Sequence, residues 1–266
     1  MNNSTSEQHC NGHVSPSWLA KLRRARFTHL LMTLSLLLFL SPLVGNFSSQ
    51  LGGTIASLLV ISLFATVLVA AALAVTNDRR HSIIAFVLAA ACLILTLLSL
   101  MSDFEILHIV QYLLTIIFLS YVICLIVGAL FRLKRVNYDT IAASLCGYLL
   151  IGVVYAVAYS LIVEINDTAI SVGNSDPAFE FVLRFGDHQT AASLYFSFVT
   201  LTTLGYGDIT PVSMPARMLT TTEALIGQLY LIVLVARLVG LHISSEMNVR
   251  QSDTRDEPGH DRDRST

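Results

Sequence analysis

Long apolar runs that are nearly free of charge restrict what this chain can fold into. Five runs approach or exceed the roughly 20 apolar residues that a helix needs to cross a bilayer, and a sixth is interrupted by Glu223 and Arg237. Charged residues make up 13% of the chain, against about 25% in soluble domains. The pattern predicts an all-α membrane protein with six transmembrane helices, which we place at Phe27–Val44, Leu51–Val75, Ser82–Ser102, Ile106–Phe131, Ile141–Val163 and Ala216–Ile243.

The segment between the fifth and sixth runs, Glu164–Pro215, is too long for a turn and too mixed in composition for a span. Its apolar part, Thr190–Thr202, is short and predicts a re-entrant helix that enters the bilayer without crossing it. Non-helical backbone at membrane depth is tolerated only where protein buries it or where it lines water. The glycine-containing stretch that follows is therefore expected to face a protein-lined pathway.

The basic residues predict an orientation. Lys and Arg gather before the first run and in the second-to-third and fourth-to-fifth connections, whereas the other connections carry acidic residues or no charge, apart from Arg184. Cytoplasmic loops are enriched in Lys and Arg. Both termini are therefore expected in the cytoplasm, with the chain in a cell membrane of the bacterial inner type.

The sequence TLGYG, followed by Asp208, carries the clearest functional signal. Rings of backbone carbonyl oxygens can replace the hydration shell of a potassium ion. Successive carbonyls point at one axis only if alternate residues take left-handed backbone angles, which Gly205 and Gly207 adopt without a Cβ penalty. The stretch Thr200–Asp208 resembles the potassium channel signature, and this resemblance implies that the potassium sites are formed by Thr203, Leu204, Gly205, Tyr206 and Gly207.

From Tyr138 to His242 the sequence resembles the pore module of potassium channels, in the prokaryotic branch of the ion-channel superfamily. The resemblance implies an outer helix, a turret, a pore helix, a selectivity filter and an inner helix. Leu204 stands where valine is usual, and Tyr195-Phe196 stands where many members have two tryptophans. The resemblance further implies that Tyr195 and Asp208 support the filter and that Gly227 is a gating hinge.

Several residues of the sixth run have more than one interpretation. An ionisable residue in a span indicates a function, and we expect Glu223 to anchor the filter through pore-helix threonines or to bond a neighbouring helix. Gly227 is either the hinge or a site of close helix packing. Arg237 is expected to extend to the inner interface as an anchor, with a gating role as the alternative. By extension of the family spacing, the residues that line the pore are Gln228, Leu231, Val235 and Val239.

One filter per chain supplies a quarter of each carbonyl ring, so the sequence predicts a homotetramer with cyclic symmetry. The expected divisions are a cytoplasmic segment (1–26), a four-helix region (27–131), a pore domain (132–243) and a disordered cytoplasmic tail (244–266). The expected partners are K⁺ ions, further copies of the chain and lipid. No cofactor and no nucleic acid are expected.

Six spans also suggest voltage gating, but the charges argue against it. A voltage sensor needs fixed charges within the membrane field, and Ile106–Phe131 contains no Lys, Arg, Asp or Glu. The first four helices are then expected to form a structural collar or to sense lipid or tension.

Two other functions are alternatives to a passive potassium channel. A subunit of a potassium transporter would be expected to carry repeated re-entrant segments, and a non-conducting membrane sensor would be expected to have a degenerate filter. Neither feature is present in this sequence. An enzyme is not expected, because no nucleophile, base or metal constellation is visible.

Overall fold

The computed structural model describes residues 26–51, 53–74, 79–99, 104–132, 138–172 and 189–253. The expectations for 1–25, for most of the turret (173–188) and for 254–266 lie outside these residues. The elements, in chain order, are α2 (Arg26–Leu51), α3 (Gly53–Ala74), α4 (Arg79–Ser99), α5 (Glu105–Arg132), α6 (Tyr138–Ile165), β1 (Ile170–Val172), α8 (Gln189–Leu201), β2 (Ile209–Pro211) and α9 (Met214–Asp253).

Four helices in the described part of the chain are long and apolar enough to cross a membrane. They contain Arg80–Ser99, Glu105–Phe131, Thr140–Ile165 and Met214–Arg237. Shorter apolar stretches lie in α2 and α3, at Phe27–Leu40 and Ser62–Ala74. Because soluble folds do not leave such helices facing water, these features support a multi-pass membrane protein.

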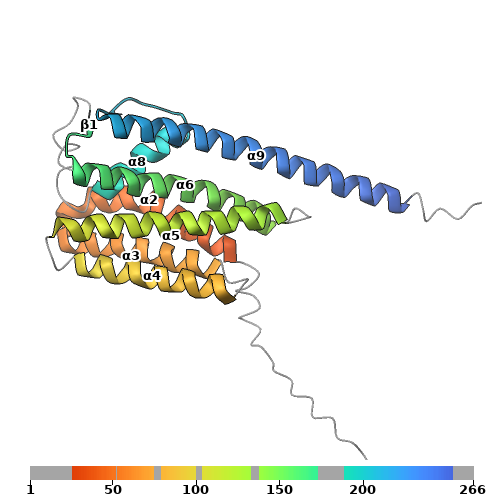
Figure 1. Cartoon of the computed structure of the whole chain (residues 1–266), viewed down its shortest axis with the longest axis horizontal. Helices are drawn as coiled ribbons and strands as arrows, with labels where there is room; N and C mark the ends of the chain where they lie inside the picture. Colours follow the sequence, from red (N-terminus) through yellow and green to blue (C-terminus); the bar gives the residue numbers. More distant parts are fainter. Residues whose placement is uncertain are drawn as a thin grey trace, which may run out of the picture.

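Helix α6 connects the first four helices, α2 to α5, with α8 and α9. Figure 1 shows the long helices side by side, with the short α8 set obliquely between α6 and α9. α6 packs against α2 and α5 on one side and against α8 and α9 on the other. Its central place explains why 61% of its apolar stretch is buried within the chain.

A two-stranded antiparallel sheet connects the region after α6 with the region before α9. Ile170 pairs with Pro211, and Val172 pairs with Ile209. The amides of Val212 and Ser213 also donate to the carbonyl oxygen of Ala169, at 2.9 and 3.1 Å. These bonds fix the chain on both sides of α8, although the two strands are far apart in sequence.

The end of α9 differs from the sequence expectation. We predicted a disordered tail from residue 244, but α9 continues as a helix through Asp253 and extends beyond the other helices (Figure 1). The sequence supplies a reason, since no Gly or Pro lies between Gly240 and Pro258. Without a residue that interrupts the backbone hydrogen bonds, a helix that is already formed can propagate through polar residues.

Candidate functional site

The segment Thr203–Gly207, here called the candidate filter, begins immediately after the last turn of α8. The amides of Leu204 and Gly205 both fold back onto the carbonyl oxygen of Val199, at 2.9 and 3.2 Å. Such bonds satisfy a helix carbonyl that would otherwise lack a partner. The candidate filter is therefore attached to the end of α8 by main-chain bonds.

Every second residue of the candidate filter has a positive φ angle. The φ angles are 58° at Thr203, 56° at Gly205 and 80° at Gly207. Two of the three positions are glycine, which adopts this region freely, whereas threonine rarely does. Such an alternation turns successive carbonyl groups toward the same side of the strand, which is the arrangement that a row of cation ligands requires.

The electrostatics of this place favour a cation. The carboxyl-terminal end of a helix carries a partial negative charge, and α8 ends two residues before Thr203. The candidate filter is also open in the single chain, with Leu204 54% and Tyr206 68% exposed. Its carbonyl groups are therefore accessible to an ion or to a partner.

The far end of the candidate filter is attached to α8 by side chains. The hydroxyl of Tyr195 donates to Oδ2 of Asp208 at 2.6 Å, and the amide of Ile209 donates to Oδ1 of the same residue at 3.0 Å. Phe196 stacks edge-on against Tyr159, with ring centroids 4.8 Å apart. The structure thus brings the two sequence-predicted support residues, Tyr195 and Asp208, into direct contact.

Glu223 lies fully buried behind α8. Its carboxylate accepts hydrogen bonds from Ser197 of α8 and from Tyr159 of α6, the latter at 2.6 Å. The Tyr159 hydroxyl also lies 3.3 Å from the Thr220 hydroxyl, and the Ser197 hydroxyl lies 2.7 Å from the carbonyl oxygen of Gly152. Since a buried carboxylate is stable only where donors surround it, this cluster joins three helices.

The partners of Glu223 include parts of both interpretations given above. On α8 the partner is the hydroxyl of Ser197 and not that of a threonine, and Tyr159 of α6 supplies the bond to a neighbouring helix. Ser197 is buried on the same side of α8 as Ser193, whereas Thr200 is only partly buried. Sequence reasoning missed Tyr159, since its only signal was a hydroxyl within an apolar run.

Gly227 lies against the end of α8. A Cβ atom added there would stand 2.7 Å from Cδ1 and 3.0 Å from the carbonyl oxygen of Leu201. The Tyr148 hydroxyl of α6 donates to that same carbonyl at 3.2 Å. Of the two interpretations of Gly227, this contact supports close helix packing. Helix α9 is continuous through Gly227.

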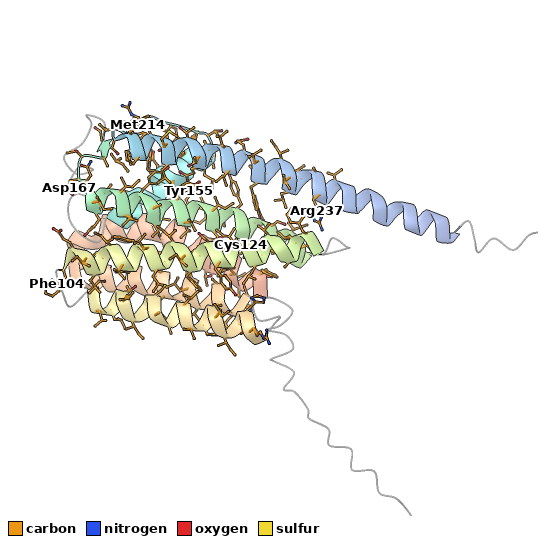
Figure 2. The ribbon with its side chains drawn as sticks, viewed as in Figure 1. Phe104, Cys124, Tyr155, Asp167, Met214 and Arg237 are labelled. Carbon is orange, nitrogen blue, oxygen red and sulfur yellow. The ribbon has the colours of Figure 1, made fainter. Side chains whose placement is uncertain are left out.

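The residues predicted to line a pore lie on α9, which is little buried by the rest of its own chain. Only 11% of the apolar stretch of α9 is buried, and its apolar side chains project outward along much of its length (Figure 2). Gln228, Val235 and Val239 are exposed, and Leu231 is partly buried.

Arg237 binds the end of α5. Its guanidinium donates to the carbonyl oxygens of Leu130 and Phe131 at 3.0 and 2.6 Å, close to the last residue of that helix, Arg132. The guanidinium also lies 4.9 Å from the centroid of the Phe131 ring. The contact with α5 is compatible with the expected anchor, and its place at the membrane interface stays a prediction. No sequence pattern indicates this contact, because its acceptors belong to the main chain.

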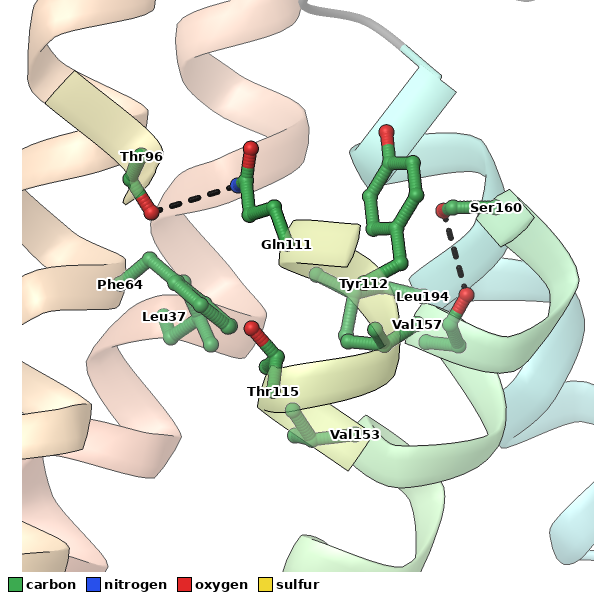
Figure 3. Close-up of a pocket in the computed structure, with 11 residues that line it drawn as sticks. Leu37, Phe64, Thr96, Gln111, Tyr112, Thr115, Val153, Val157, Ser160 and Leu194 are labelled. Carbon is green, nitrogen blue, oxygen red and sulfur yellow. Dashed lines mark hydrogen bonds between the residues drawn. The ribbon is translucent and has the colours of Figure 1, made fainter. Parts of the chain in front are cut away.

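A cavity of about 90 Å³ lies between the first four helices and α6 and α8 (Figure 3). In its wall the Gln111 amide donates to the Thr96 hydroxyl at 3.2 Å. The lining contains no Lys, Arg, Asp or Glu, and consists of Leu37, Phe64, Thr96, Gln111, Tyr112, Thr115, Val153, Ala156, Val157, Ser160 and Leu194. The lining of this cavity is therefore uncharged.

Comparison with known proteins supports an ion-channel family for the part of the chain that contains this site. Residues 170–242 match a family model described as ion channel. A stretch of 52 residues is 42% identical to the two pore potassium channel c of rice, Oryza sativa subsp. japonica. This match covers 20% of the present chain and 11% of the rice protein, so only a small part of that relative is compared.

Proposed function

We propose that the chain is one subunit of a homotetrameric, potassium-selective channel that conducts K⁺ passively across the cell membrane, and that it is not an enzyme. The observation that carries this proposal is the alternation of positive φ angles at Thr203, Gly205 and Gly207 directly after a short buried helix. The ion-channel match over the same region supports it. The candidate filter is then the selectivity filter, and α8 is the pore helix.

The conduction mechanism follows from the backbone. Four copies of the candidate filter around one axis would form stacked rings of carbonyl oxygens, which replace the water that a potassium ion loses on entry. No group has to gain or lose a proton during the passage. The hydrogen bonds at both ends of the filter, to Val199 and from Tyr195 to Asp208, would hold the rings at a fixed spacing.

The assembly is supported by what a single chain leaves uncovered. α9 contributes a long apolar helix of which little is buried, and Tyr206 of the filter is largely exposed. Neighbouring subunits would cover both surfaces. Cyclic symmetry closes such an assembly without unpaired surfaces, and four copies complete the carbonyl rings.

In the membrane we place α2, α3, α4, α5, α6 and α9 as six spans and α8 as a re-entrant helix. Both chain termini then lie in the cytoplasm, and the sheet of β1 and β2 lies at the outer mouth. The acidic residues Glu164 and Asp167 would lie near this mouth, where they raise the local cation concentration. Three further acidic residues of this segment, Asp176, Glu180 and Asp187, are outside the described residues.

The test is an ion-flux measurement on protein reconstituted into liposomes. The wild type should take up K⁺ and Rb⁺ and largely exclude Na⁺. Gly205→Ala and Gly207→Ala should abolish the selective flux, because an alanine in a left-handed conformation costs about 1–2 kcal/mol per subunit. Gly240→Ala is the control, since a Cβ at Gly240 meets nothing within 4 Å. Equal Na⁺ and K⁺ uptake by the wild type would contradict the proposal.

A further inference from the structure

The carboxyl-terminal end of α5 and the far part of α9 are joined by one side chain. Figure 2 shows Arg237 beside the end of α5. An apolar cavity of about 270 Å³ lies between the two helices beside this contact, and Phe131 and Arg237 are among the residues that line it. Its walls include Val127 and Leu130 on α5 and Leu229, Tyr230 and Val233 on α9. Since side chains do not fill this space, the Arg237 contact is the main polar connection between these two helices among the described residues.

The contact suits both partners chemically. The last four carbonyl groups of a helix have no acceptor role within it, and the carbonyls of Leu130 and Phe131 belong to this group because α5 ends at Arg132. A cation is favoured at this end of a helix, and a guanidinium presents several N–H groups in a planar fork. The Phe131 ring adds a cation–π contact on the guanidinium.

The contact also offsets a cost for each helix. An arginine on an apolar membrane helix is unfavourable unless it is bonded or reaches water, and the last carbonyl groups of α5 need partners from outside their own helix. If α9 moved away from α5, both costs would return together. The bonded position of α9 is therefore favoured over any position in which this part of the helix has shifted.

We infer that Arg237 is a latch through which the four-helix region (27–131) controls the opening of the pore. It holds α9, as one continuous helix, against the end of α5, and the channel opens when this contact breaks. This inference rests on the proposed function, with α9 as the helix that lines the pore. It gives the first four helices a role that needs no gating charge. Any stimulus that moves the end of α5 would then act on the pore through Arg237.

The experiment is single-channel recording of the full-length protein in planar bilayers with symmetrical K⁺. Arg237→Gln removes the charge and the fork, and should raise the ratio of open to closed time by about tenfold or more, because hydrogen bonds to charged groups are among the stronger ones. Arg237→Lys should have a smaller effect, since a lysine retains the charge without the fork. Arg250→Gln removes the same charge from a later position on α9 and should leave gating unchanged.

A second variant tests the contact itself. Phe131→Leu removes the ring beneath the guanidinium and should raise opening by a smaller factor. Combined with Arg237→Gln, it should add nothing further, because coupled residues are not additive. Phe104→Leu, at the exposed residue just before α5, should not change opening in either background. These variants keep the test valid if Arg237→Gln does not assemble.

Several outcomes would overturn the latch. Unchanged or lower opening in Arg237→Gln would do so, as would an equal effect of Arg250→Gln. Additive effects of the Arg237 and Phe131 substitutions, or a loss of thermal stability without any change in gating, would also overturn it. A wild-type protein that conducts no K⁺ would instead refute the proposed function.

Discussion

The hydroxyl of Tyr195 donates a hydrogen bond to Asp208 across 2.6 Å, which attaches the middle of α8 to the residue that follows the candidate filter. We predict that Tyr195→Phe weakens the filter without changing the fold, because the ring stays and only the hydroxyl is lost. A charge-assisted bond of this kind contributes about 1.5–3 kcal/mol. Single-channel recordings should therefore show shorter openings.

Tyr112→Phe is the matched control for this substitution. The Tyr112 hydroxyl forms no hydrogen bond to another described residue, although the side chain lies on a cavity wall. Openings as long in Tyr195→Phe as in Tyr112→Phe and the wild type would show that the bond does not stabilise the conducting filter.

The buried carboxylate of Glu223 should matter for stability. Glu223→Ala removes the 2.6 Å acceptor of the Tyr159 hydroxyl, at a cost of about 1–3 kcal/mol for a buried group, whereas the Ser197 hydroxyl can still donate to the carbonyl oxygen of Gly152. Glu223→Gln keeps one acceptor oxygen and should cost less. We expect the thermal midpoint of the detergent-solubilised assembly, monitored by size-exclusion chromatography, to fall in the order wild type, Glu223→Gln, Glu223→Ala. Glu105→Ala, at an exposed acid on α5, should have the wild-type midpoint, and an equal midpoint for Glu223→Ala would refute this prediction.

The contact of Gly227 with Leu201 separates packing from hinge motion. Gly227→Ala should lower both stability and open probability, because its Cβ would stand 2.7 Å from Leu201 Cδ1. If packing is the reason, Leu201→Ala in the same chain makes room and should restore part of the loss. A hinge role predicts no such rescue. Gly128→Ala on α5, where a Cβ has open space, should behave as the wild type in both measurements.

Sequence reasoning predicted the helices and the candidate filter because their signals are local. Apolar length indicates a span, the short run before TLGYG indicates α8, and glycine indicates left-handed backbone. The partners of Glu223 and Arg237 could not be predicted in this way. Tyr159 lies 64 residues from Glu223, and the acceptors of Arg237 are carbonyl groups that every residue possesses. Such contacts depend on how helices pack, which the pattern of a single helix does not determine.

The conductance of the proposed channel should depend only weakly on voltage. Each charge that crosses the membrane contributes about 2.3 kcal/mol per 100 mV, and α5 carries no Lys, Arg, Asp or Glu between Ile106 and Phe131. The nearby cavity also has a neutral lining. A conductance–voltage curve in symmetrical K⁺ should be shallow, and a steep curve with several apparent gating charges per channel would contradict this expectation.

The central claim is that Thr203–Gly207 forms a potassium-selective pathway. Its most direct test is the reversal potential of the purified wild-type protein in a bilayer with K⁺ on one side and an equal concentration of Na⁺ on the other. We predict a reversal potential far from zero, toward the equilibrium potential of K⁺, which Gly205→Ala and Gly207→Ala abolish and Gly240→Ala preserves. A wild-type current that reverses at zero would show that the pathway does not distinguish the two ions.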